Sequence, residues 1–140
     1  MRDRTFVDTN VLIYAHDIDA GAKHEIGKKV LLELWAQRTG MLSMQVLQEF
    51  YTNATRKLRT PLPKPMARVV VDTYAVWCVD AVTTSDMTAA FRIEDDAKIG
   101  FWDALIIAVA VRSGATRLLS EDLNPGQQIA GLVVENPFSA

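Results

Sequence analysis

Four acidic residues of the chain stand beside short apolar segments that have the composition of strands or helices: Asp8, Glu49, Asp103 and Asp122. Asp8 and Asp122 come just after apolar, β-prone segments, whereas Glu49 and Asp103 lie early in segments with helical spacing. Carboxylates that meet in one partly buried cleft repel each other, so some bind protons or a cation neutralises them. Oxygen ligands without Cys or His are typical of Mg²⁺ or Mn²⁺, and such ions support chemistry on phosphates.

Short apolar segments supply the predicted strands. They comprise residues 5–7, 41–43, 79–82, 117–119 and 132–134. Most of them lack the strict alternation of apolar and polar residues that a half-exposed strand has. This composition indicates strands that are buried on both faces, as the strands of parallel sheets usually are.

Longer segments with apolar residues at helical spacing separate these strands. The predicted helices cover residues 23–38, 45–58, 65–78, 85–98 and 101–112. Gly40 is expected to stop the first helix, Pro65 suits the first turn of the third, and Ser85 is a natural N-cap for the fourth. The near-continuous apolarity of residues 101–112 predicts a helix that is buried on several sides.

Strands that alternate with helical connections predict an α/β fold, in which helices cover both faces of a parallel sheet. The carboxyl ends of such strands share one edge, where ligands bind. Asp8 and Asp122 follow strands at this edge, and Asp103 lies in the first turn of a helix. Glu49 can reach back to the same edge, because helical side chains lean toward the helix N-terminus. Each acid also fits an ordinary role as a cap, a dipole partner or an exposed residue, but their joint placement favours a shared site.

The composition limits the class of protein. The chain has 140 residues, of which 49% are hydrophobic, and this predicts one domain spanning residues 1–140. A single cysteine, Cys78, allows no intrachain disulfide, and one Cys with two His excludes the usual thiolate zinc site. The longest apolar run, residues 104–111, is shorter than the ~20 residues of a membrane span, and the segment MRDRTFVDTN lacks a signal-peptide pattern. We therefore expect a cytoplasmic protein without membrane association.

Four segments, in this order, strongly resemble the PIN-domain ribonuclease family, and within it the VapC-type toxins of bacterial toxin–antitoxin systems: FVDTNVLIYA, SMQVLQEF, GFWDALIIAVA and LLSEDLNPGQ. The resemblance extends from Phe6 to about Gln127. It implies a three-layer α/β/α sandwich with a mostly parallel central sheet.

The resemblance implies a function for the acidic residues. They match the catalytic, metal-binding quartet of the family: Asp8, Glu49, Asp103 and Asp122. The implied activity is that of a Mg²⁺- or Mn²⁺-dependent endoribonuclease, the toxin of a toxin–antitoxin pair that inhibits translation and growth. In this interpretation the acids hold metal and are not primarily acid–base catalysts.

Polar residues near the quartet match supporting positions of the family: Thr9, Asn10, Ser43 and Ser120. Asn10 and Ser120 could donate hydrogen bonds to the carboxylates or to waters on the metal, although turn and capping chemistry fits them nearly as well. Ser43 is expected to cap the helix that carries Glu49. The side chain of Glu121 is expected to point away from the site.

A basic stretch without acids offers possible RNA contacts: Arg56, Lys57, Arg59, Lys64 and Arg68. The net charge of −2 argues against a broad surface that coats nucleic acid, so this stretch is where attraction of phosphates is expected. An ordinary solvated helix end followed by a loop would have the same composition.

The resemblance also implies protein partners. Toxins of this type form homodimers, and an antitoxin neutralises them by inserting a peptide into the active-site groove. An anionic site would attract an Arg or Lys of the antitoxin. The apolar segments 26–35 and 47–58 are candidates for the dimer face.

Two other functions stay open. A PIN-type module could bind RNA or protein without cutting. Haloacid-dehalogenase-like phosphatases carry an Asp-x-Asp motif after their first strand, but Asn10 stands in place of the second Asp and removes their acid–base group. Metal-dependent cleavage of RNA, tested beside quartet variants, discriminates the nuclease from the binding module.

Overall fold

A mostly parallel sheet runs through the centre of the molecule. The computed structural model describes residues 3–139, and within them the sheet has five strands in the order β2-β1-β3-β5-β4. Strands β2, β1, β3 and β5 are parallel neighbours, whereas β4 pairs antiparallel with β5 at one edge. The strands are β1 (Thr5–Val7), β2 (Gly40–Met41), β3 (Arg117–Leu119), β4 (Gln128–Ile129) and β5 (Leu132–Glu135).

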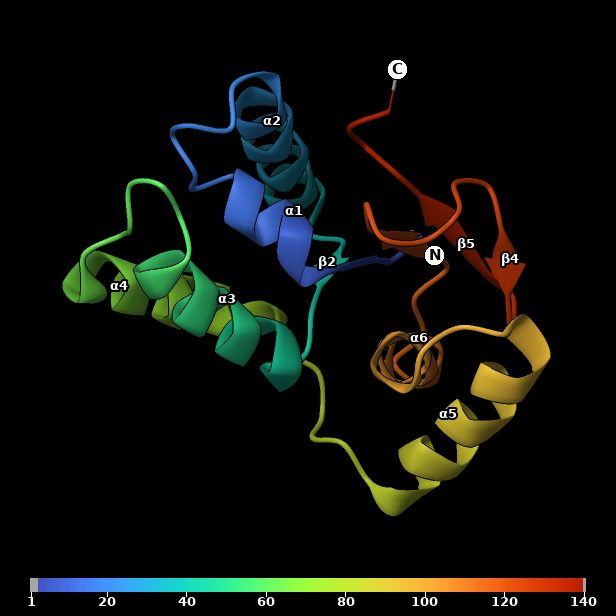
Figure 1. Ribbon diagram of the computed structural model, residues 1–140. Coiled ribbons are helices and arrows are strands. Elements are labelled where there is room, and N and C mark those ends of the chain that lie inside the picture. The colour runs from blue at the N-terminus through green and yellow to red at the C-terminus, as the bar shows by residue number, and fades with distance from the viewer. Residues whose placement is uncertain (1–2, 140) are drawn as a thin grey trace.

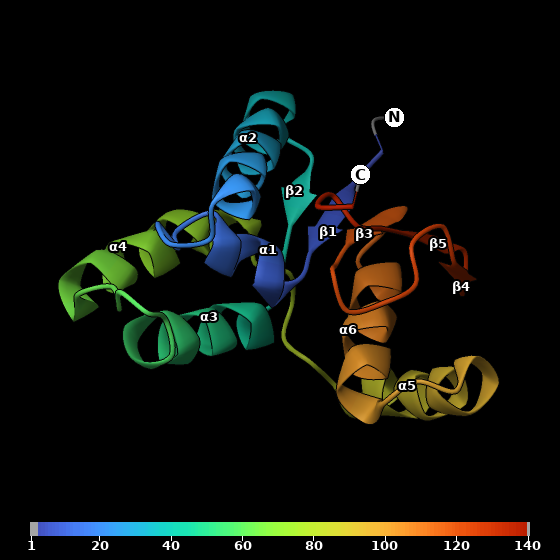
Figure 2. The same ribbon diagram turned by 45° about the horizontal axis from the view of Figure 1, so that its top comes forward.

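Helices cover both sides of this sheet, so the predicted three-layer α/β/α sandwich is confirmed. Helices α1–α4 gather on one side of β1, and α5 and α6 lie on the other (Figures 1 and 2). The helices are α1 (Thr9–Tyr14), α2 (Ala22–Gln37), α3 (Met44–Arg56), α4 (Lys64–Tyr74), the 3₁₀ helix η1 (Ala75–Trp77), α5 (Thr84–Ala97) and α6 (Phe101–Arg112).

The core holds the register of the sheet. Phe6, Leu118 and Val134 are aligned across β1, β3 and β5, and all three side chains are fully buried. A slip of one residue would move this apolar row to the opposite face, so burial fixes which residues are neighbours. Helix α6 is buried continuously from Ala104 to Ala110, as its apolarity predicted. No helix within residues 3–139 is long and apolar enough to cross a membrane.

The start of α5 differs from the predicted cap at Ser85. Thr83 is the N-cap, and its hydroxyl accepts a hydrogen bond from the backbone N–H of Asp86 at 3.3 Å. The Asp86 carboxylate in turn accepts from the backbone N–H of Thr83 at 2.9 Å, which completes a capping box. Asp86 also accepts two hydrogen bonds from Arg112 of α6, so this cap joins the two helices.

Residues 79–82 do not form the predicted strand. Within residues 3–139, the only sheet-like pairing beside this segment is an isolated parallel bridge between Leu42 and Cys78. The Arg112 guanidinium donates to the backbone carbonyls of Asp80 and Ala81 at 3.1 and 3.4 Å. These carbonyls would accept hydrogen bonds from a neighbouring strand if the segment were part of the sheet.

Two further local features departed from expectation. Gly40 does not stop α2, which ends at Gln37 and is followed by the C-cap residue Arg38 in a left-handed conformation with φ 59°. Gly40 begins β2 instead, where a Cβ atom would lie 2.6 Å from Cη2 of Trp77. Strand β4 was not predicted, because only two residues precede its tight turn at Ala130 and Gly131.

Replacing Thr83 by Ala should lower the free energy of unfolding by about 1 kcal/mol, because the helix loses the side-chain acceptor of its capping box. Urea unfolding followed by circular dichroism measures this loss. Ser85→Ala is the matched control, since Ser85 is exposed and lies within the helix. A larger loss for Ser85→Ala than for Thr83→Ala would contradict the assignment of the cap.

Candidate active site

Asp8 lies at the carboxyl end of β1 and forms the buried base of the site. Its backbone N–H donates to the carbonyl of Leu119 at 3.0 Å, which continues the pairing of β1 with β3. As the N-cap of α1, its Oδ1 accepts from the backbone N–H of Thr9 at 2.7 Å. Its Oδ2 accepts from the hydroxyl of Ser120 at 2.7 Å, so both carboxylate oxygens are held by neutral donors.

The electrostatic environment of Asp8 disfavours its charged form. Burial raises the pKa of Asp8 to about 6, although the hydrogen bonds from Ser120 and Thr9 act in the opposite direction. The negative charges of Asp122 and Asp103 raise this pKa further. Asp8 therefore interacts electrostatically with two other members of the quartet.

Asp103 reaches the same edge from the other side of the sheet. It lies in the first turn of α6 and is half-buried. Burial raises the pKa of Asp103, and the charges of Asp122 and Glu49 add to the increase. Asp103 thus links the acids electrostatically, since its charge acts on Asp8 and its own pKa responds to the charges of Asp122 and Glu49.

Glu49 is positioned through α1. Its helix, α3, begins after Ser43, whose side chain accepts a hydrogen bond from the backbone N–H of Val46 at 3.4 Å. Ser43 therefore caps α3, as the sequence predicted. From the second turn of α3, the half-buried Glu49 accepts a hydrogen bond from the hydroxyl of Thr9 at 3.1 Å.

Asp122 is the exposed member of the quartet and lies in the loop that follows β3. Its carboxylate accepts a hydrogen bond from the side-chain amide of Asn10 at 3.1 Å, and its backbone N–H donates to the Ser120 hydroxyl at 3.1 Å. The Asn10 carbonyl oxygen accepts from the backbone N–H of Glu121 at 3.3 Å. Asn10 and Ser120 thus join α1 and β1 to this loop.

Sequence reasoning missed two residues beside the site. The Glu121 side chain points away from Asp122, as predicted, and contacts Tyr14 and Lys23. These partners lie 107 and 98 positions away in the chain, so no local motif marks them.

The carboxylates converge without forming a ready-made cation cage. Within residues 3–139, no group of three or more His, Cys, Asp or Glu side chains is arranged to hold a metal ion as it stands. Hydrogen bonds from Thr9, Asn10 and Ser120 occupy carboxylate oxygens in this arrangement. The quartet is a cluster of oxygen donors with unneutralised charge, which is the environment that a hard divalent cation favours.

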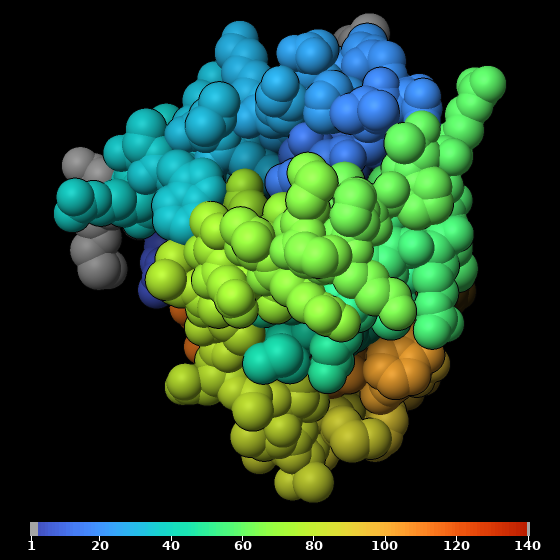
Figure 3. All heavy atoms as spheres, turned by 90° about the vertical axis from the view of Figure 1, so that its left-hand side faces the viewer, coloured from blue at the N-terminus to red at the C-terminus, as the bar shows by residue number. Residues whose placement is uncertain are grey.

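The basic stretch is exposed to solvent, and it begins on the same helix as Glu49. Its side chains are exposed at the end of α3, in the α3–α4 connection and on α4: Arg56, Lys57, Arg59, Lys64 and Arg68. Figure 3 shows this part of the chain, in green, on the outer surface of the side formed by α1–α4. Arg56 is seven residues beyond Glu49 on α3, which corresponds to about 10 Å along the helix axis.

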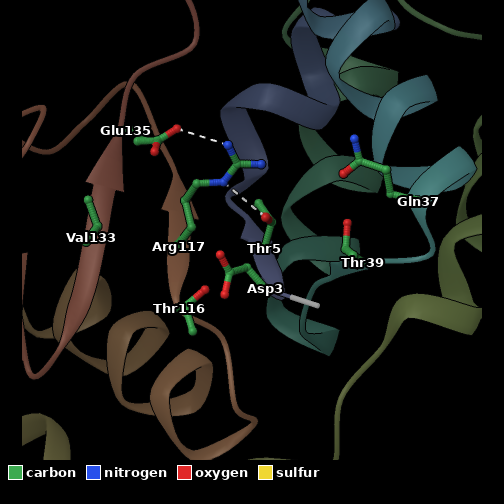
Figure 4. A pocket seen from close by; sticks show the side chains of 8 residues that line it. All are labelled: Asp3, Thr5, Gln37, Thr39, Thr116, Arg117, Val133 and Glu135. Atoms are coloured by element: carbon green, nitrogen blue, oxygen red, sulfur yellow. Dashed lines mark hydrogen bonds and ion pairs between the residues drawn. The ribbon is translucent and has the colours of Figure 1, made fainter. Parts of the chain in front are cut away.

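A polar hollow of about 660 Å³ lies near the start of β1 and β3, at the opposite edge from Asp8 (Figure 4). Arg117 crosses it, donating to the Thr5 hydroxyl at 3.1 Å and to the Glu135 carboxylate at 3.1 Å. None of the quartet lines this hollow, so it is separate from the acidic cluster.

This fold and its acidic edge define an α/β domain with a carboxylate site, and the comparison with protein families identifies it. The model of the PIN domain matches residues 5–128, so the chain belongs to the PIN domain family. A comparison with curated protein sequences gives no significant match.

Solved structures with the same fold include toxins of toxin–antitoxin systems. VapC20 of Mycobacterium tuberculosis, a toxin that cleaves the sarcin–ricin loop, is 25% identical with a TM-score of 0.57, over 81% of this chain and 86% of that one. A toxin–antitoxin complex from Klebsiella pneumoniae has 18% identity and a TM-score of 0.69, over 97% and 99% of the two chains. VapBC2 from Rickettsia felis, bound to a promoter DNA fragment, has 19% identity and a TM-score of 0.62, over 94% and 97%.

The raised pKa of Asp8 predicts how stability depends on pH in a metal-free buffer. The folded protein holds this proton more tightly than the unfolded chain, so the stability that protonation contributes is lost as pH rises through about 6. The Asp8→Asn side chain carries no titratable proton, so the variant does not lose this stability as pH rises. It should therefore be more stable than the wild type near neutral pH. The advantage should grow by up to about 3 kcal/mol between about pH 4 and pH 7.5.

Urea unfolding at several pH values, with a chelator present, measures this difference. Asp95→Asn, on the exposed surface of α5, is the control for removal of one negative charge. A gain in stability for Asp8→Asn that stays constant over the pH range would show that Asp8 does not titrate as described.

Proposed function

We propose that the protein is a Mg²⁺- or Mn²⁺-dependent endoribonuclease that acts as the toxin of a toxin–antitoxin pair. One observation carries the proposal: the buried Asp8 at the end of β1 lies near the charges of Asp103 and Asp122, and Asp103 lies near those of Asp122 and Glu49. The four carboxylates come from the end of β1, the loop after β3, and helices α3 and α6. Membership of the PIN domain family supports the same function. Burial of Asp8 among like charges is costly for a merely structural residue, and this favours a role in catalysis.

The donor set fits a hard divalent cation. Asp8, Glu49, Asp103 and Asp122 would supply only carboxylate oxygens, which suit Mg²⁺ and Mn²⁺. When bound, such an ion supplies activation of water and stabilisation of charge on the phosphodiester.

The surrounding residues would keep the carboxylates in place. Ser120 and the Thr9 backbone hold Asp8, the Thr9 hydroxyl orients Glu49, and the Asn10 amide orients Asp122. These donors are neutral, so they leave the negative charge of the cluster available to a cation.

RNA is the proposed substrate. The 25% identical VapC20 is described as a toxin that cleaves the sarcin–ricin loop, and this supports an RNA target for the present chain. The exposed basic stretch from Arg56 to Arg68 would contact phosphates away from the cleaved bond, since Arg56 lies about 10 Å beyond Glu49 along α3. We also propose a cytoplasmic location, since cellular RNA is found there.

The proposed assembly has protein partners as well. Structural neighbours that are toxin–antitoxin complexes support a cognate antitoxin. We further propose a homodimer of chains that each form a single PIN domain over residues 1–140. The quartet would attract a basic side chain of the antitoxin into the site.

Asp103→Asn should reduce RNA cleavage by roughly 100-fold or more, because the charge that would hold a cation is lost from a central position in the cluster. The test is incubation of purified protein with RNA and Mg²⁺ or Mn²⁺, with and without chelator. Asp96→Asn on α5 is the matched surface control. Full activity of Asp103→Asn would contradict the assignment of the site. RNA binding by the wild type without metal-dependent cleavage would support the non-catalytic module.

Cation binding should also be visible without catalysis. Because a ligand that binds only the folded state stabilises it, saturating Mn²⁺ should raise the melting temperature of the wild type. The increase should shrink strongly in Asp8→Asn and Asp103→Asn and persist in Asp96→Asn. Equal increases in all four proteins would contradict binding at the quartet.

A further inference from the structure

A second group of contacts holds the loop after β3 from outside the acidic cluster. The Tyr14 hydroxyl donates to Oε1 of Glu121 at 2.7 Å, and the Lys23 ammonium donates to Oε2 at 2.5 Å. The Lys23 ammonium also lies 4.9 Å from the centre of the Tyr14 ring. Phe138 packs edge-on against that ring, with centroids 4.9 Å apart.

We propose that Tyr14, Lys23 and Glu121 form a clamp that positions Asp122 for cation binding and catalysis. The clamp rests on the proposed nuclease function. Its members are positioning residues, because Tyr14 and Lys23 bind the Glu121 side chain and act on Asp122 through the backbone that links the two acids. Glu121 and Asp122 are adjacent, so anchoring one side chain to α1 and α2 limits the directions in which the other can turn.

The geometry favours a clamp over an incidental surface ion pair. Both oxygens of Glu121 are engaged, and the two donors come from α1 and α2, whereas Glu121 itself follows β3. The Glu121 side chain is 25% exposed, compared with 47% for Glu135 in the ion pair with Arg117. An exposed pair contributes little, whereas a partly buried carboxylate with two donors restrains the chain more strongly.

The clamp also acts together with the contacts of Asn10. The Asn10 carbonyl accepts from the backbone N–H of Glu121, and the Asn10 amide donates to the carboxylate of Asp122. Without the clamp, this exposed aspartate would depend on Asn10 and on the Ser120 hydroxyl alone. Greater freedom of Asp122 would weaken cation binding, since a ligand must be ordered before it can coordinate.

Another role for Lys23 would be direct binding of an RNA phosphate. The structure favours the clamp, because the ammonium is already paired with Glu121. The two roles predict different kinetics. Loss of a phosphate contact raises KM for RNA with little change in kcat, whereas loss of a positioning contact lowers kcat and cation affinity.

The test uses Glu121→Gln and Tyr14→Phe in the full chain, with Glu135→Gln as the matched control. Calorimetric titration should give a Mn²⁺ affinity about 10-fold weaker for the first two variants and unchanged for the control. Their kcat should fall in parallel, while KM for RNA stays near the wild-type value. Lys23→Arg should retain most of the Mn²⁺ affinity, and Lys23→Met should lose it.

Amide hydrogen exchange of the metal-free proteins tests the clamp independently of nuclease function. The backbone N–H groups of Glu121 and Asp122, which donate to Asn10 and Ser120, should exchange faster in Glu121→Gln and Tyr14→Phe than in Glu135→Gln. Unchanged exchange in both variants overturns the clamp, as does a change confined to KM. A wild type that neither binds Mn²⁺ nor cleaves RNA overturns the proposed function instead.

Discussion

The acidic edge of this protein depends on holding carboxylates close together without cancelling their charge. The groups that donate hydrogen bonds to the quartet within residues 3–139 are neutral: the backbone N–H of Thr9, the hydroxyls of Thr9 and Ser120, and the amide of Asn10. Such donors orient a carboxylate, but its repulsion of neighbouring charges persists. Burial raises the pKa of Asp8 to about 6, and the charges of Asp122 and Asp103 add to this increase. A lysine or arginine in the same positions would neutralise the cluster and remove its affinity for a cation.

The rest of the fold provides the rigidity that this repulsion requires. Strands β1 and β3 are paired in a register that buries Phe6 and Leu118 completely, and this pairing brings Ser120 to Asp8. On the other side of the sheet, the buried helix α6 carries Asp103 in its first turn. The free energy that stabilises the fold comes from apolar burial behind the edge, so the acids themselves need not stabilise it.

Local patterns in the sequence predicted much of the architecture. The bounds of β1, β3 and α6 agree with prediction, because each is a dense apolar segment ended by a clear change of composition. The strand predicted for residues 79–82 was wrong because a distant side chain decided the outcome. The cap predicted at Ser85 was wrong because the local capping box of Thr83 and Asp86 starts α5 earlier. Arg112 takes the carbonyls of Asp80 and Ala81, which lie in the segment predicted as a strand, and it also binds the Asp86 carboxylate of the Thr83 cap.

The sequence by itself determined the types of the four acids, their association with strand ends and helix starts, and the family resemblance. Only the tertiary structure decided how they meet. Asp8 and Ser120 are 112 positions apart, and their contact depends on β1 lying beside β3. The structure also decided that Asp8 is buried while Asp122 is exposed, and that Tyr14 and Lys23 are the partners of Glu121. Local spacing describes neighbours within a helix or strand, whereas strand order and register arise from packing over the whole chain.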